Sequence, residues 1–281
     1  ETTLVWDKKT GKTFGPAIIW QDRRTAAACQ PLRDAGKEKE VQALSGLLLD
    51  PYFSATKIRW ILDTYPEAQK AADEDRAAFG TVDSFLLSRL TSGREHSTDV
   101  TNASRTALMD LAASSWSTHL CKVFNVPWSV LPSIASTGGE FGETDKSVFG
   151  KSLPVLSMVG DQQAALVGQA CINPGEAKIT YGTGAFLVAN TGTELPVSQN
   201  RLLATSAFQA QGRMNFALEG SIFNAGTVVK WLRDELGLVS HAADTEAMAA
   251  ELEDNGGVYF VPAFTGLGAP HWAPDARGQI S

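Results

Sequence analysis

Cysteine and histidine are scarce in this sequence, with three and four residues among 281. Cys29, Cys121 and Cys171 lie far apart and form no C-x-x-C pair, which argues against a disulfide framework and a zinc site. The histidines show no metal-ligand spacing, and a G-x-S-x-G motif is missing, so zinc-dependent and serine hydrolases lose support. This cysteine usage favours a reducing cytoplasm.

Long apolar runs and an excess of positive charge are also missing. No apolar run approaches the roughly 20 residues that cross a bilayer, and the first residues do not have the layout of a signal peptide. The formal net charge is −7, whereas nucleic acids and anionic membrane surfaces attract clustered lysine and arginine. We therefore expect a cytoplasmic protein with no nucleic-acid partner and no membrane insertion.

The residues that are present are typical of a folded globular protein, with 43% hydrophobic and 20% charged. A chain of 281 residues can bury a core large enough for two domains. It opens at Glu1 without a methionine and stops shortly after a loop, so we interpret it as a piece of a longer protein. After Asn173 the sequence changes to a series of short segments typical of strands, which predicts domains over residues 1–172 and 173–281.

Helical spacing of apolar residues dominates the first part of the chain. It predicts buried helices from about residue 54 to residue 65 and over residues 81–90. Two β-branched or aromatic runs, 2–6 and 17–20, flank a polar turn and predict a β-hairpin. Asp22 fits the N-cap of a following helix.

Polar composition predicts exposed segments on both sides of these helices. The charged stretch 71–78 is expected to face solvent, and the Gly- and Ser-rich stretch 132–151 is expected to form a loop. A buried strand over 153–159 and a helix over 162–169 follow. Asp161 lies at their junction, where α/β proteins often build sites, although an ordinary helix N-cap explains an aspartate there equally well.

The second part of the chain mixes strands and helices, which predicts an α/β architecture. The predicted strands cover residues 177–181, 185–189, 203–208, 214–218 and 258–261, and the predicted helices lie around 228–232 and 245–252.

Asp161 and Gln162 are the strongest candidates for chemistry. A carboxylate near a polyol hydroxyl can accept its proton while the oxygen attacks phosphorus, which is the base role in phosphoryl transfer. Gln162 could bind a second hydroxyl, or could simply lie in a solvated first helical turn. Trp20, Tyr52 and Phe186 could form an apolar wall for a small polyol, although such aromatics more often belong to the core.

The segment Tyr181-Gly182-Thr183-Gly184 fits a tight turn whose backbone N–H groups approach a phosphate, but an ordinary hairpin has the same pattern. A G-x-x-x-x-G-K-[ST] motif is missing, so nucleotide binding would not be of the P-loop type. The residues alone therefore lead to an α/β protein with phosphoryl transfer as one option.

Several long stretches resemble the glycerol kinase family, and together they extend over the whole chain. They are WQDRRTA (20–26), DPYFSATK (50–57), FGTVDSFLL (79–87), TDVTNASRTAL (98–108), GDQQAAL (160–166), YGTGAF (181–186), ALEGSIFNAG (217–226), WLRDEL (231–236) and VPAFTGLGAP (261–270).

The resemblance implies an actin-like, ribonuclease H-like fold of two α/β domains with ATP and glycerol in the cleft between them. The implied reaction is ATP- and Mg²⁺-dependent phosphorylation of glycerol to sn-glycerol 3-phosphate, with Asp161 as general base. The positions that match the family's glycerol pocket are Glu1, Trp20, Tyr52, Asp161, Gln162 and Phe186. Those on the nucleotide side are Thr183, Gly226 and Lys230, and no metal ligand is assigned.

Several departures from the family pattern matter. Lys230 stands where bacterial relatives often carry glutamine. The family's opening glycine-rich phosphate loop, its Mg²⁺-associated aspartate, the arginine before Glu1 and the later adenosine-binding segment are all missing. We therefore expect the 281 residues to be inactive alone, whereas a longer parent chain could carry the missing parts.

Two alternatives stay open. A kinase of another small sugar or polyol, such as xylulose or gluconate, would keep the fold and the base, but such relatives usually depart from the Gln-Gln pair after the aspartate. A non-catalytic polyol-binding protein would keep the fold alone, and retention of Asp161 argues against it. The sequence is compatible with a homo-oligomer, dimer or tetramer, and does not decide the oligomeric state.

The loop 144–153 is shorter than its counterpart in relatives that fructose 1,6-bisphosphate inhibits, and it lacks their Gly-Gly-x-Arg pattern. We therefore predict weak or absent inhibition by this sugar. Assays of glycerol phosphorylation by the full-length protein, with and without the bisphosphate, check this, and strong inhibition would contradict it.

Overall fold

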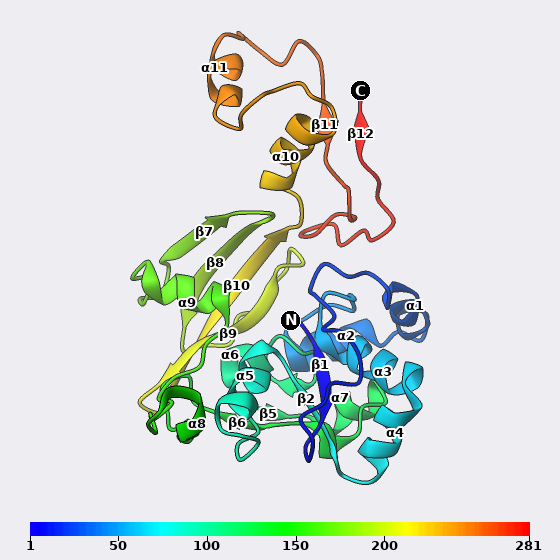
Figure 1. Cartoon of the computed structure of the whole chain (residues 1–281). Helices are drawn as coiled ribbons and strands as arrows, with labels where there is room; N and C mark the ends of the chain where they lie inside the picture. Colours follow the sequence, from blue (N-terminus) through cyan, green and yellow to red (C-terminus); the bar gives the residue numbers. More distant parts are fainter.

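Helices and three pairs of short strands make up the first 160 residues of the computed structural model, which describes residues 1–281 (Figure 1). The helices are α1 (Ala26–Asp34), α2 (Glu38–Ser45), α3 (Ser54–Thr64), α4 (Pro66–Asp73), α5 (Val82–Leu90), α6 (Val100–Ala103), α7 (Thr118–Val123), α8 (Lys146–Phe149) and the 3₁₀ turn η1 (Trp128–Val130). The pairs are antiparallel β1 (Leu4–Asp7) with β2 (Ala77–Gly80), parallel β3 (Ser97–Asp99) with β6 (Ser133–Ala135), and antiparallel β4 (Met109–Asp110) with β5 (Ser115–Trp116).

The largest hydrophobic core lies in this N-terminal unit. In α3, Ile58, Ile61 and Leu62 are buried at the i, i+3, i+4 spacing of one helical face, and they belong to the same cluster as Phe79 of β2. Tyr65 alone separates α3 from α4, and Pro66 is the first residue of α4, where its missing N–H costs no helical hydrogen bond.

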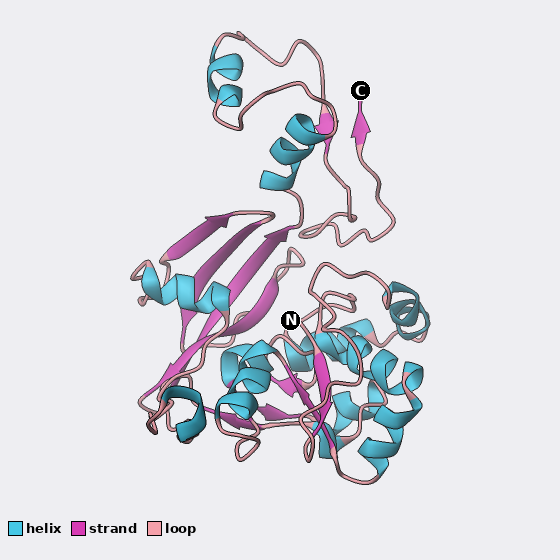
Figure 2. Cartoon of the chain, viewed as in Figure 1, coloured by secondary structure: helices cyan, strands magenta, loops and turns pink.

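The second unit is a four-stranded antiparallel sheet with one helix packed on it (Figure 2). The strand order is β7-β8-β10-β9, and the strands are β7 (Ala177–Tyr181), β8 (Ala185–Gly192), β9 (Leu203–Ala210) and β10 (Arg213–Ile222). Helix α9 (Asp161–Gly168) buries Leu166 against Val188, Ala207 and Ala217 of the sheet. The turn between β9 and β10 has positive φ at Gln211 and at Gly212, as expected for a tight hairpin turn.

The two units are in direct contact through α2, α6 and β9. Ser104 after α6 and Thr205 of β9 share a hydroxyl hydrogen bond of 2.9 Å. The N–H of Ala204 donates to the carbonyl of Gly46 at 3.0 Å. Gly46 ends α2 with φ +76°, and a Cβ there would lie 2.3 Å from the carbonyl oxygen of Ala204. Only glycine therefore fits this approach between the units.

Most of the last 60 residues extend beyond the sheet (Figure 1), whereas Trp272 packs back into the largest core. This extension contains α10 (Gly226–Asp234), α11 (Asp244–Ala250) and the pair β11 (Phe260–Val261) with β12 (Gln279–Ile280). Neither helix contains a buried residue. No helix of the structure has both the length and the apolar character that crossing a membrane requires.

Several sequence predictions for individual segments are wrong. Residues 153–159 form no strand but only isolated bridges, and Leu156 is 58% exposed. Residues 71–78 do not face solvent as a whole, because Ala71, Ala72 and Ala77 are buried in α4 and β2. The predicted hairpin is confirmed only in part: it forms as the antiparallel bridges Thr3 with Ile18 and Trp6 with Thr13, while the other edge of β1 pairs with β2.

The start of the first helix also differs. Thr25, rather than Asp22, occupies its N-cap position, and Asp22 binds the backbone and guanidinium of Arg24 instead. By contrast, the four sheet strands lie where alternation predicted them, with the last three extended at their ends.

His96 generates a prediction for stability. Its Nε2 donates to the carbonyl of Phe79 at 2.7 Å, its ring contacts Trp6, and burial lowers its pKa to about 4. The unfolded chain therefore binds a proton at higher pH than the folded one. The contribution of neutral His96 to the free energy of unfolding is complete above pH 6.5 and is lost as the pH falls towards 4. We expect a loss of about 3 kcal/mol between pH 7 and 4 from this group alone.

Urea unfolding of the full-length protein and its His96→Gln variant at both pH values measures this contribution. Glutamine retains a donor near the position of Nε2 but does not titrate. An equal pH dependence in the two proteins would contradict the assignment.

Candidate active site

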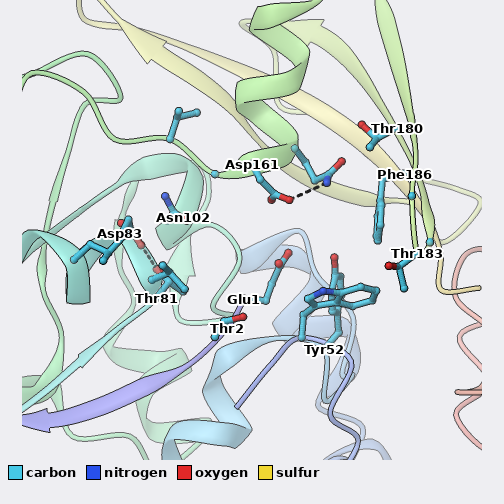
Figure 3. A pocket seen from close by; sticks show the side chains of 18 residues that line it. Glu1, Thr2, Tyr52, Thr81, Asp83, Asn102, Asp161, Thr180, Thr183 and Phe186 are labelled. Carbon is cyan, nitrogen blue, oxygen red and sulfur yellow. Dashed lines mark hydrogen bonds between the residues drawn. The ribbon is translucent and has the colours of Figure 1, made fainter. Parts of the chain in front are cut away.

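A cavity of about 570 Å³ opens between the two units (Figure 3). Residues from both units line it, including the start of the chain, the first turn of α5, the first turn of α9 and the turn between β7 and β8. Seven of the nine predicted site residues are in its wall, and these are Glu1, Trp20, Tyr52, Asp161, Gln162, Thr183 and Phe186.

Asp161 is the first residue of α9, and its side chain does not cap the helix. Gly160 occupies the N-cap position, and no side chain there accepts a hydrogen bond from the helix. The carboxylate of Asp161 is exposed in the cavity, and its hydrogen-bond partner is the amide Nε2 of Gln162 at 3.1 Å. The capping role that the sequence left open is therefore wrong, and the carboxylate is available to a ligand.

A buried hydrogen-bond chain fixes the start of α9. The N–H of Gly160 donates to Oγ1 of Thr101 at 2.8 Å, and that hydroxyl donates to the carboxylate of Asp99. Asp99 also caps α6 and accepts a hydrogen bond from Thr137. The position of Asp161 is thus tied to the N-terminal unit through its neighbour.

Three aromatic side chains form one apolar side of the cavity. The ring of Trp20 meets the rings of Tyr52 and Phe186 edge to face, with centroid separations of 5.6 Å in both cases. Tyr52 and Phe186 are buried against the core, and Trp20 is half-buried. The wall suits the carbon side of a small molecule whose hydroxyls face the polar side.

Glu1 faces the cavity from the side opposite Asp161 (Figure 3). Its carboxylate accepts a hydrogen bond from Nε of Arg105 at 2.6 Å, and Nη2 of Arg105 donates to Glu219 of β10 at 2.8 Å. Burial raises the pKa of Glu1, while the positive charge of Arg105 and its hydrogen bond to the carboxylate lower it. Glu1 is therefore an ionised acceptor for a hydroxyl group.

The turn between β7 and β8 packs against the start of α10. The N–H of Gly226 donates to the carbonyl of Gly182 at 2.8 Å, and a Cβ on Gly226 would lie 2.5 Å from that oxygen. Thr183 accepts from the N–H of Ala225 at 2.8 Å. Gly226 therefore adjoins the turn without lining the cavity, and Lys230 lies further along α10, exposed and outside the cavity wall.

The cavity contains a further carboxylate that the sequence did not single out. Asp83 accepts hydrogen bonds from the hydroxyls of Thr81 and Thr98, and burial raises its pKa. No three histidine, cysteine, aspartate or glutamate side chains in the structure are grouped to hold a metal ion.

Sequence reasoning also missed Arg105 and Lys178, which lie behind the cavity wall. Arg105 is part of the stretch TDVTNASRTAL and Asp83 of FGTVDSFLL, so the resemblance contained a signal for both. Lys178 could have been found in a different way, because it is a charged residue on the inward face of a predicted strand.

Comparison with known proteins places the chain in a family. Models of the FGGY family of carbohydrate kinases match it, the N-terminal domain over residues 1–168 and the C-terminal domain over residues 177–281. The chain belongs to the FGGY family of carbohydrate kinases.

The similar curated proteins carry a more specific name. The chain is 57% identical to a glycerol kinase of Rhodospirillum centenum and 54% identical to glycerol kinase 1 of Pseudomonas aeruginosa, over its full length in both cases. It spans 56% and 57% of those two proteins. The chain thus corresponds to somewhat more than half of its curated relatives.

Solved structures agree on the fold. A Plasmodium falciparum glycerol kinase with ADP matches with a TM-score of 0.88 and 38% identity, over 100% of this chain and 56% of that one. A gluconate kinase of Lactobacillus acidophilus matches with a TM-score of 0.83 at 18% identity, over 99% of this chain and 56% of that one, which shows the fold alone. The actin-like, ribonuclease H-like α/β fold is confirmed, with the chain covering part of it.

The Glu1–Arg105–Glu219 arrangement generates a prediction. Arg105→Met leaves two buried carboxylates without their shared cation, and we expect unfolding to become easier by about 3 kcal/mol or more. Glu219→Gln leaves Arg105 paired with Glu1, so we expect a smaller loss. Denaturant unfolding of the full-length protein at pH 7 measures both, and an Arg105→Met loss under about 1 kcal/mol would contradict the structural role.

Proposed function

We propose that the full-length protein containing this chain is a glycerol kinase, which transfers the γ-phosphoryl group of ATP to glycerol and forms sn-glycerol 3-phosphate. The proposal rests on the carboxylate of Asp161, which does not cap its helix and is free to bind a ligand. It lies in a cavity with an aromatic wall, opposite the ionised Glu1. The curated relatives named glycerol kinase, identical to this chain at more than half of its positions, support the substrate.

In the proposed reaction Asp161 is the general base. A hydroxyl of glycerol donates its proton to the carboxylate, and its oxygen forms the new bond to the γ-phosphorus. The bond between that phosphorus and the β–γ bridging oxygen breaks, and its electron pair leaves with ADP. Glu1 and Gln162 bind the other hydroxyls, while Trp20, Tyr52 and Phe186 contact the carbon chain and exclude water.

We propose that the nucleotide lies near the turn that contains Thr183 and packs against Gly226. Backbone N–H groups around such glycines can approach phosphate oxygens closely. Lys230 is exposed one helical turn beyond Gly226, which supports at most a peripheral contact. We propose that Mg²⁺ arrives with ATP, because Mg²⁺ is usually bound by one or two carboxylates together with substrate phosphates.

A boundary near residue 172 between domains 1–172 and 173–281 is also our proposal. It falls between the ranges that the two family models match. Because the chain spans about 56% of its relatives, we propose that these residues alone are inactive. A cytoplasmic location and assembly into a dimer or tetramer stay predictions.

Two other functions compete with glycerol kinase. A kinase of another small polyol or sugar would use the same fold and base, and low-identity structural matches include xylulose and gluconate kinases. A polyol-binding protein without transfer would retain the cavity but not the reaction. The free carboxylate of Asp161 favours a kinase over the binding protein.

Asp161→Asn in the full-length protein tests the proposal. The amide cannot accept the hydroxyl proton, so we expect the turnover rate with ATP and glycerol to fall by at least about a hundredfold. Glycerol affinity should change far less, because the side chain keeps its shape. Coupled measurement of ADP formation and calorimetric titration of glycerol separate the two effects.

The same assay with xylulose, gluconate and other polyols separates the competing functions. Turnover of another polyol but not of glycerol would show the substrate assignment to be wrong. Glycerol binding with no ADP formation by the folded wild-type protein would favour the binding protein.

A further inference from the structure

Lys178 lies in β7 with its side chain turned towards the cavity wall. It is 5% exposed, whereas Ile179 beside it is 50% exposed and Tyr181 is 78% exposed. The strand therefore directs its polar residues inward and its apolar residues outward, the reverse of the usual pattern. A buried lysine is rare without bound partners, so its contacts call for an explanation.

The ammonium group of Lys178 has three acceptors, and none is a carboxylate. Its Nζ donates to Oε1 of Gln162, to Oγ1 of Thr180 at 2.8 Å and to the carbonyl of Phe186 at 3.4 Å. Gln162 and Phe186 both line the cavity. Burial lowers the pKa of Lys178, while the charges of Glu219 and Asp161 raise it.

These contacts decide which way the Gln162 amide faces. An ammonium group has donors only, so the amide atom next to Lys178 must be the acceptor Oε1. The Nε2 group is then turned towards Asp161, to which it donates at 3.1 Å. The amide is thus held from both ends, by the ammonium of Lys178 at Oε1 and by the carboxylate of Asp161 at Nε2, and loss of Lys178 frees the Oε1 end.

We propose that Lys178 is a positioning residue that orients the Gln162 amide and the backbone of Phe186 for the polyol. The inference rests on the proposed function. The oriented amide presents an N–H donor beside the acceptor Asp161, and this pair matches two adjacent hydroxyls. One hydroxyl gives its proton to Asp161, and its neighbour accepts a hydrogen bond from Gln162.

A double-mutant cycle in the full-length protein tests the proposal with Lys178→Met, Gln162→Ala and the double variant. We expect Lys178→Met to raise the KM for glycerol by about tenfold, the effect of losing one charge-assisted hydrogen bond. The KM for ATP should change by less than about twofold. In the Gln162→Ala background, Lys178→Met should add less than about a further twofold, because the amide on which it acts is gone.

Lys151→Met is the matched control, because Lys151 is exposed and lies outside the cavity wall. It should leave both KM values unchanged. Lys178→Arg retains the charge and its donors, so we expect it to restore part of the glycerol affinity that Lys178→Met loses.

Three outcomes would overturn the inference: a wild-type KM in Lys178→Met, equal effects on glycerol and ATP, or full additivity with Gln162→Ala. Thermal melting checks that each variant folds. If Lys178→Met does not, Lys178→Gln, which keeps a donor without the charge, replaces it in the same cycle. Failure of the proposed function would differ, because the wild-type protein would then not phosphorylate glycerol at all.

Discussion

The guanidinium of Arg105 connects the two halves of the structure. It is 4% exposed and bridges Glu1 on one side and Glu219 in β10 on the other. Burying one cation with two anions costs much of the Coulomb energy that the pairs supply, so their net contribution to stability is modest. Such a network contributes to the geometry, because Arg105 pairs with both carboxylates only when it lies between Glu1 of one unit and Glu219 of the other. The cavity exists at this fixed junction.

Different interactions hold the two sides of that cavity in place. The aromatic side is an extension of the hydrophobic core of the N-terminal unit, so its shape is held by close packing. The polar side is held by hydrogen bonds, from Asp99 through Thr101 to Gly160 and from Lys178 to Gln162. A polyol needs both, because one side of the molecule is carbon and the other carries hydroxyls.

The sequence was sufficient to predict those helices and strands that depend mainly on the residues within the segment. The four sheet strands, the helix that begins at Asp161 and the helix from Ser54 follow from alternation or helical spacing of apolar residues. The stretch 153–159 has the same apolar character but forms no regular strand, because it pairs with residues 137–144 only through isolated bridges and stays half exposed. Strand formation depends on a neighbour that the segment itself does not encode.

The sequence by itself determined the family, the α/β class and most of the residues around the cavity, because the matching stretches carry those residues in a fixed order. Tertiary structure alone decided that Asp161 is free of a capping role, since that depends on where the helix begins in space. It alone revealed Lys178 behind Gln162 and Arg105 between Glu1 and Glu219. Contacts between residues 16 to 114 positions apart arise only when the chain folds, and no local pattern specifies them.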